Sequence, residues 1–316
     1  DDDSASFTLG AISGTVSEGA TTATFTVVLG AQPDSDVVIS VTSGDEGEAT
    51  VDAAELTFTN GNWNSAQTVT VTGVDDNLVD GSVNTTITMS VKDASSDNNF
   101  DALADQTVTV TTTDNDTAAF TLGAITGTVS EGATTATFTV VLGAQPDSDV
   151  VISVTSGDEG EATVDAAELT FTNGNWNSAQ TVTVTGVDDN LVDGSVNTTI
   201  TMSVKDASSD NNFDALADQT VTVTTTDDDT AAVTLSGTTA TVTEAAGPGN
   251  TATFTVVLAV QPVGNVVIDL SANDGTEATV APASLTFTTG NWNSAQTVTV
   301  TGVDDNIIAV SYTHLR

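Results

Sequence analysis

Residues 68–76 read Thr68-Val69-Thr70-Val71-Thr72-Gly73-Val74-Asp75-Asp76. Apolar and polar residues alternate through the first five positions, with Val on one side and Thr on the other. This period of two predicts a β-strand whose Val side chains face a core while its Thr side chains face water. Two aspartates follow at once. The stretch therefore predicts a half-buried strand that ends in an acidic loop.

Similar runs recur through the first 113 residues. Thr107-Val108-Thr109-Val110-Thr111 alternates in the same way, and further strand candidates lie at residues 23–29, 37–42, 55–59 and 83–91. Clusters of Gly, Asp, Asn and Pro separate these runs, as turns do between strands. No segment carries a helical period. About seven short antiparallel strands per domain predict an all-β fold of immunoglobulin-like β-sandwiches.

The sequence repeats itself. Residues 7–12 recur at residues 120–125, an offset of 120 − 7 = 113. Four positions differ between the first two copies: Ser4/Thr117, Ser6/Ala119, Ser13/Thr126 and Asn115/Asp228. A third, diverged copy begins near residue 230 and rejoins the pattern at Asn291-Trp292-Asn293. We predict three tandem domains: unit 1 at residues 4–116, unit 2 at 117–229 and a truncated unit 3 at 230–306.

Both ends of the sequence look cut. Residues 1–3 stand where Asp114-Asn115-Asp116 joins units 1 and 2, so we expect them to be a linker remnant of a preceding unit. Residues 310–316 hold the only Tyr, the only His and the only Arg of the chain. We therefore expect the tail at residues 307–316 to be non-native sequence.

The composition restricts the possible partners. The chain has 44 acidic residues against 3 basic ones, a net charge of −41, and no cysteine. Such a surface repels nucleic acid and anionic membranes, and no apolar run approaches the ~20 residues that span a bilayer. Hydrophobic residues make up 38%, which argues against a disordered acidic chain. A cation is the natural partner of so many carboxylates.

Three acidic clusters hold the same place in successive units. One lies at Val74–Gly81, one at Asp114–Asp116 and one at Ser17-Glu18-Gly19. Calcium takes six to eight oxygen ligands, mostly from loops, so convergence of these clusters at one end of a sandwich would form a calcium site. The alternative is that they are solvated turn residues, because Asp and Asn favour turns. Acidity could also reflect a saline habitat, but the recurrence in loops favours calcium.

At these clusters the sequence resembles Calx-beta repeats. The resemblance rests on Ser17-Glu18-Gly19, Asn273-Asp274-Gly275-Thr276, Leu56-Thr57-Phe58, the strand that leads into Asp75-Asp76, and Asp114-Asn115-Asp116. Residues 61–67, Gly-Asn-Trp-Asn-Ser-Ala-Gln, are similar to the Calx-beta-like repeats of very large secreted bacterial adhesins. The resemblance implies calcium at one pole of each sandwich. Its implied ligands are Glu18, Asp45, Asp75, Asp76, Asp80, Asp114 and Asp116 in unit 1; Glu131, Asp158, Asp188, Asp189, Asp193, Asp227 and Asp229 in unit 2; and Glu244, Asp274, Asp304 and Asp305 in unit 3.

Two further motifs each allow two interpretations. Asp97-Asn98-Asn99-Phe100-Asp101 imitates the start of an EF-hand loop, but Ala102 and Val108 occupy the positions that need Gly and Glu. We interpret it as an ordered polar loop anchored by Phe100 and Leu103. Trp63 could stack on a sugar, but we expect it to cover the edge of the core.

The sequence shows no recognisable arrangement of catalytic residues. The only His lies in the predicted tail, so Ser-His and Cys-His schemes are unavailable. Carboxylate pairs are abundant, yet nothing in the sequence singles out one pair as a buried acid and base. We expect the protein not to be an enzyme.

The main functional hypothesis is a calcium-binding stalk or extender of a large extracellular adhesin. Calcium ions and neighbouring repeats would be its partners, with the ions stiffening the junctions between domains. One alternative is a module that binds glycans or proteins. The other is an accessory module of a secreted enzyme.

Overall fold

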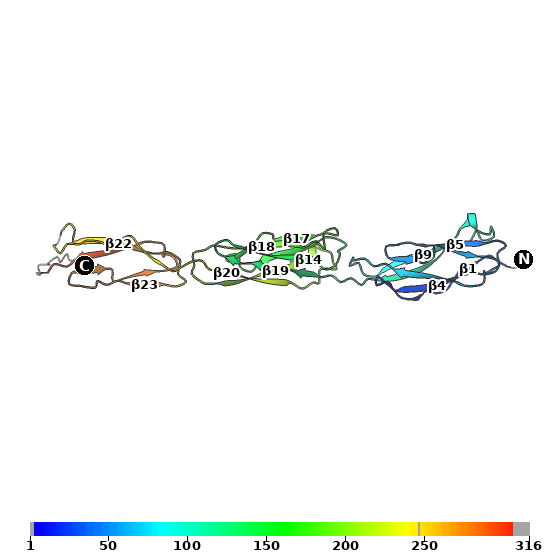
Figure 1. Cartoon of the computed structure of the whole chain (residues 1–316), viewed down its shortest axis with the longest axis horizontal. Helices are drawn as coiled ribbons and strands as arrows, with labels where there is room; N and C mark the ends of the chain where they lie inside the picture. Colours follow the sequence, from blue (N-terminus) through cyan, green and yellow to red (C-terminus); the bar gives the residue numbers. More distant parts are fainter. Residues whose placement is uncertain (1–2, 246, 306–316) are drawn as a thin grey trace, which may run out of the picture.

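The structure is a computed structural model that describes residues 3–245 and 247–305. Three β-sandwiches follow one another in sequence order along the long axis of the chain (Figure 1). No helix within these ranges is long and apolar enough to cross a membrane. The predicted tail at residues 307–316 lies outside the described residues.

Unit 1 consists of two five-stranded sheets packed face to face. The first contains β1 (Phe7–Leu9), β2 (Ser13–Gly14), β4 (Thr22–Leu29), β6 (Ala49–Val51) and β8 (Gln67–Gly73). The second contains β3 (Val16–Ser17), β5 (Val37–Ser43), β7 (Glu55–Phe58), β9 (Val83–Val91) and β10 (Gln106–Thr113). The order is β1-β4-β8-β6 in one sheet, where β2 also pairs with β4, and β3-β10-β9-β5-β7 in the other. A single 3₁₀ turn, η1, spans Asp93–Ser95.

Unit 2 repeats this architecture strand for strand. Its strands are β11 (Phe120–Leu122), β12 (Thr126–Gly127), β13 (Val129–Ser130), β14 (Thr135–Leu142), β15 (Val150–Ser156), β16 (Ala162–Val164), β17 (Glu168–Phe171), β18 (Gln180–Gly186), β19 (Val196–Val204) and β20 (Gln219–Thr226), and η2 spans Asp206–Ser208. The described part of unit 3 has β21 (Val233–Leu235), β22 (Thr251–Leu258), β23 (Val266–Asp269), β24 (Ala278–Ala281), β25 (Ser284–Phe287) and β26 (Gln296–Gly302).

Alternating side chains build the core between the two sheets. In β8 the Val69 and Val71 side chains are fully buried while the intervening threonines remain accessible. Val69 pairs with Phe25 of β4, and Phe58 from the opposite sheet is fully buried as well. The expected all-β sandwich fold is therefore confirmed, and burial of these apolar side chains drives its formation.

Unit 3 has a more open core in its described part. Its first sheet keeps four strands, but β23 pairs with β25 alone. Val233 is 50% exposed, whereas Phe7, its counterpart in unit 1, is 3% exposed. The described residues of unit 3 include no strands that correspond to β9 and β10, so the second sheet consists there of β23 and β25 alone.

The longer expected strands all form, and the structure adds short ones. Strands β1, β2, β3 and β6 contain only two or three residues, too few for a period of two to be recognised. The Asp97–Asp101 stretch is an ordered loop, as expected, with Phe100 buried and Leu103 packed against the core. Trp63 packs against the same core, and its carbonyl oxygen accepts a hydrogen bond from the Leu29 amide.

Gly73 of β8 is required by a close approach between the two sheets. A Cβ at this position would lie against the Ser17 carbonyl oxygen of β3, far inside van der Waals contact, and Gly186 meets Ser130 in the same way. We predict that Gly73→Ala combined with Gly186→Ala destabilises each unit by about 1–3 kcal/mol through overpacking. Scanning calorimetry would measure the loss as a lower melting temperature.

The control for this prediction is Gly61→Ala combined with Gly174→Ala. A Cβ at Gly61 would meet only the Thr59 hydroxyl, at 3.8 Å, which is an ordinary contact. The control pair should therefore stay within about 0.5 kcal/mol of the parent protein. Equal melting temperatures for both pairs of variants would contradict the predicted close approach.

Candidate metal centre

A short parallel strand brings two distant acidic segments together. Strand β3 pairs in parallel with β10, with Val16 opposite Thr112 and Ser17 opposite Thr113. The next residues, Glu18 and Asp114, consequently leave the sheet side by side. The Glu18 amide donates a hydrogen bond to the Thr113 carbonyl oxygen at 3.2 Å.

Three carboxylates meet at this end of unit 1. Glu18, Asp114 and Asp116 each offer an oxygen, and these oxygens all lie within 4.8 Å of one another. Glu18 is only 2% exposed, while the two aspartates are half-buried. The Asn115 amide donates a hydrogen bond to Glu18 Oε2 at 3.0 Å, and the Asp116 amide donates one to Asp114 Oδ1 at 2.6 Å. We call these three side chains, with Asp75, Asp76 and Asp80, the acidic cluster.

The loop after β8 supplies the rest of the acidic cluster. Asp75 Oδ1 accepts a hydrogen bond from the Asn115 side-chain amide at 3.1 Å. Gly81 closes the loop onto the terminal run by donating its amide hydrogen to Asp114 Oδ2 at 2.8 Å. Asp80 is half-buried, and its Oδ1 has no hydrogen-bond partner. The loop thus points further carboxylates toward the same pole.

Asp45 lies at the edge of this group, and a neighbouring glutamate was missed by the sequence analysis. The carboxylate of Asp45 is exposed and accepts a hydrogen bond from the Gly47 amide at 2.9 Å. Glu48 is only 9% exposed, and Asp80, Asp76 and Asp45 all act on it electrostatically. Its recurrence as Glu161 and Glu277, each three residues after the turn aspartate, is a signal that could have revealed it.

Burial and like charge make ionisation of these groups costly. Desolvation by burial raises the pKa of Glu18 to about 6, opposed by the Asn115 hydrogen bond and reinforced by the charges of Asp114, Asp76 and Asp80. Burial, with the same kind of repulsion, also raises the pKa values of Glu48, Asp80 and Asp116. A cluster of this kind is stabilised by protons or by a cation.

Unit 2 rebuilds the cluster with the same geometry. Glu131, Asp227 and Asp229 bring carboxylate oxygens within 4.8 Å of one another, and Glu131 is 1% exposed. Asp227 Oδ2 accepts the Gly194 amide hydrogen at 2.8 Å. The remaining predicted side chains of this unit, Asp158, Asp188, Asp189 and Asp193, lie on the corresponding loops.

Unit 3 does not gather its acidic residues in the same way. Groups of three metal-ligating side chains occur in units 1 and 2 but not among the described residues of unit 3. Asp274 is exposed and accepts hydrogen bonds from Thr276, and Asp304 is exposed too. Glu244 and Asp305 are half-buried. The counterpart of the Asp114–Asp116 run is not part of the described unit.

The side chains of units 1 and 2 suit a hard divalent cation. Calcium prefers several carboxylate and carbonyl oxygens from loops, and the donors of the cluster are all oxygens. Asp80 Oδ1 and Asp116 Oδ2 are buried without a hydrogen-bond partner, as is Asp229 Oδ2 in unit 2. Buried carboxylate oxygens are normally paired, so these atoms are candidates for ligands of an ion.

The fold and this pole together define a tandem array of acidic β-sandwich repeats. The sequence matches the Calx-beta domain family over residues 1–116, 113–229 and 226–312. The protein belongs to the Calx-beta domain family, as the resemblance at the acidic clusters predicted. A comparison with curated proteins finds no match.

Several solved structures are similar over part of their length. The chain is 14% identical to CBD12 from CALX1.2, covering 60% of this chain and 75% of that one, with a TM-score of 0.24. It is 15% identical to domains 4 and 5 of the S-layer protein SbsC, covering 71% and 99%, also with a TM-score of 0.24. SSP-19 from Caenorhabditis elegans is 16% identical, covering 32% and 91%, with a TM-score of 0.22. Because these scores are low, the assignment rests on the family match.

We predict that acidification stabilises the metal-free protein between pH 7 and pH 5. The folded-state pKa of Glu18, about 6, lies above its ordinary value of 4.5. Between these two values the folded state therefore holds a proton that the unfolded state has released, and stability rises as the pH falls. Calorimetry in the presence of a chelator should give a higher melting temperature at pH 5 than at pH 7.

The matched variant is Glu18→Gln combined with Glu131→Gln. It removes the two most deeply buried carboxylates of the clusters, so its melting temperature should rise less on acidification than that of the parent protein. A parent melting temperature that falls between pH 7 and pH 5 would contradict the predicted linkage.

Proposed function

We propose that this chain is a calcium-binding, non-catalytic stalk segment of a larger extracellular adhesin. The observation that carries the proposal is the acidic cluster, in which a nearly inaccessible Glu18 lies against Asp114 and Asp116. No basic side chain balances it: Lys92 and Lys205, the basic residues of the described part of the chain, pair with Glu55 and Glu168, and all four side chains are about half exposed. A bound cation is the simplest source of the missing charge.

The residues that would hold the ion come from three segments of unit 1. Glu18, Asp75, Asp76, Asp80, Asp114 and Asp116 supply carboxylate oxygens, and Asp45 and Glu48 lie beside them. A divalent cation here supplies positive charge that offsets the mutual repulsion of these groups. Ligation also ties the loop after β8 and the linker after β10 to the end of β3. The junction with the next unit is thereby stiffened.

The arrangement of the units supports a spacer role. The three sandwiches extend in a row instead of folding back on one another (Figure 1). Unit 1 carries 17 acidic residues against Lys92 alone. Neighbouring units therefore repel each other where ions do not screen their charges. Tandem arrays whose members contact only their neighbours add length in proportion to repeat number. The resemblance of residues 61–67 to repeats of very large secreted bacterial adhesins supports the adhesin context and the extracellular location.

We predict that calcium binds to the full-length chain and that Asp116→Asn combined with Asp229→Asn weakens this binding. Both residues carry an unpartnered buried oxygen, so the substitution removes a ligand without breaking a hydrogen bond of that oxygen. The calcium affinity should fall by at least about tenfold, since substitution of residues that only hydrogen-bond to metal ligands already causes losses of this size. Isothermal titration calorimetry measures the effect.

The control is Asp105→Asn combined with Asp218→Asn. These exposed aspartates precede β10 and β20 and therefore lie at the opposite ends of those strands from Asp114 and Asp227. The control changes the net charge equally but should leave calcium affinity unchanged. Equal losses in both pairs would mean that bulk charge, not the cluster, attracts the ion.

We also predict that calcium straightens the chain in solution. Small-angle scattering should give a larger maximum dimension with millimolar calcium than with chelator, because ligation removes the freedom of the junction. The Asp116→Asn/Asp229→Asn protein should keep the smaller dimension in both conditions. If the parent protein shows the same maximum dimension and melting temperature with and without calcium, the stiffening role is wrong.

A further inference from the structure

One apolar side chain of unit 1 is buried in unit 2. Val79, in the loop after β8, is 9% exposed and belongs to the core cluster that unit 2 forms. The other described members of that cluster come from residues of unit 2 itself. Val79 therefore packs in the core of the following repeat and is not a member of the core cluster of its own unit.

Backbone hydrogen bonds fix the position of this side chain. Leu78 and Gln145 form a parallel β-bridge between the two units. The Gln145 amide donates a hydrogen bond to the Asn77 carbonyl oxygen at 2.7 Å, and the Val79 amide donates one to the Gln145 carbonyl oxygen at 3.0 Å. Such bridges set a definite register, because a shift by one residue would turn Val79 away from the core.

A side chain of unit 2 holds the segment from the other side. Asn212 donates a hydrogen bond through Nδ2 to the Val79 carbonyl oxygen at 2.6 Å. Asn212 is itself fixed, because its amide donates to Asp210 Oδ1 at 2.9 Å and the next residue, Phe213, is fully buried. This is the unit 2 copy of the loop that resembles half an EF-hand, and neither the fold nor the acidic cluster explains its asparagine.

We propose that Asn77–Val79 is a docking plug and that unit 2 provides its seat, formed by Gln145 and Asn212 beside the core of that unit. The partner that fits the plug is the next copy of the same repeat, joined head to tail. The proposal concerns the interface between repeats and does not require an ion at the acidic cluster. It assigns to the Asp210–Phe213 loop a role in recognising the preceding repeat.

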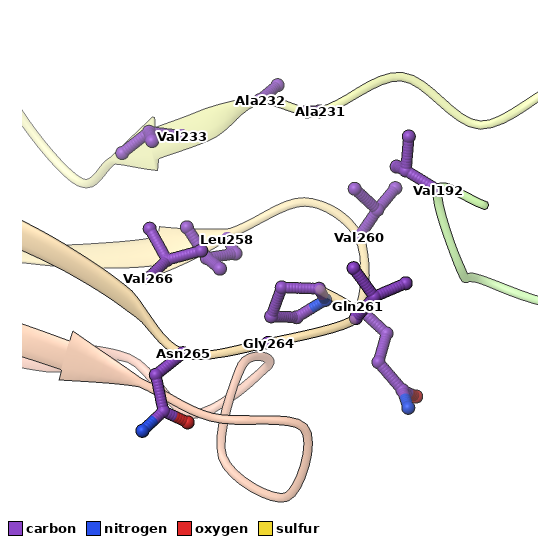
Figure 2. Close-up of a pocket in the computed structure, with 12 residues that line it drawn as sticks. Val192, Ala231, Ala232, Val233, Leu258, Val260, Gln261, Gly264, Asn265 and Val266 are labelled. Carbon is purple, nitrogen blue, oxygen red and sulfur yellow. The ribbon is translucent and has the colours of Figure 1, made fainter. Parts of the chain in front are cut away.

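The second junction of the chain shows the same plug on an incomplete seat. Leu191 bridges Gln261, and the Gln261 amide donates to the Asn190 carbonyl oxygen at 2.6 Å. Val192, however, is only half-buried and lines an open cavity of about 610 Å³ beside Val260 (Figure 2). The described part of unit 3 has no counterpart of Asn212. The parallel bridge thus forms without a counterpart of Asn212, and Val192 is less buried than Val79 where the seat is incomplete.

The closing experiment measures the distance between units 1 and 2. The chain has no cysteine, so Thr57→Cys and Thr170→Cys, both on exposed positions, accept spin labels at defined sites. Pulsed electron paramagnetic resonance of the full-length protein should give one narrow distance distribution. Val79→Asp places a charge in an apolar seat and should lower the ratio of docked to undocked molecules about a hundredfold, which broadens the distribution. Asn212→Ala should broaden it less, because it removes one hydrogen bond and leaves the valine in place.

Two matched variants serve as controls. Asn99→Ala makes the same change as Asn212→Ala in unit 1, and Val192→Asp makes the same change as Val79→Asp at the other junction. Neither should alter the distance between units 1 and 2. A distribution unchanged by Val79→Asp, or broadened equally by all four variants, would overturn the proposal. Measuring the parent protein with calcium and with chelator separates the docking proposal from the calcium-stiffening role. A distance that does not change with calcium counts against the stiffening role. The effect of Val79→Asp tests the docking proposal in either condition.

Discussion

The parallel pairing of β3 with β10 is the constraint on which the pole of each unit depends. Only two residues of β3, Val16 and Ser17, take part, yet their register places Glu18 beside Asp114. The approach is close enough that Gly73 is needed where β8 passes β3. A pairing this short is stable only because the long strands of both sheets hold its surroundings in place. The sandwich core thus stabilises an arrangement that the mutual repulsion of the carboxylates at the pole opposes.

That opposition explains how polar and apolar groups are distributed along a unit. On the strands, Thr side chains face outward and Val side chains face inward, and neither residue carries a charge. The carboxylates are gathered at the strand ends, where loop amides such as those of Asn115 and Gly81 donate hydrogen bonds to them. These few donors leave oxygens of Asp80 and Asp116 unpaired. Hydrogen bonds within the described part of the chain therefore leave these oxygens uncompensated, so that protons, cations or water would stabilise them.

The sequence predicted the fold and some of the residues of the acidic cluster. Alternation over residues 68–72 predicted β8, and the recurrence of Glu18 and Asp114 predicted members of one cluster, because each signal lies in a short local pattern. Glu48 was missed because it sits inside a turn-like acidic stretch, where its burial depends on strands far away in the sequence. Val79 was missed for a related reason: its loop looks like any acidic turn, and its buried environment belongs to the next repeat.

The loop from Asp75 to Gly81 therefore has two sides with different partners. Asp76 and Asp80 face the acidic cluster of their own unit, while Val79, between them, lies in the core of the next one. Successive residues of an extended segment point in opposite directions, so a single loop can satisfy both demands only in one register. Moving the loop to relieve repulsion at the pole would also pull Val79 from its seat. Charge balance within one repeat and docking of the next are consequently properties of the same few residues.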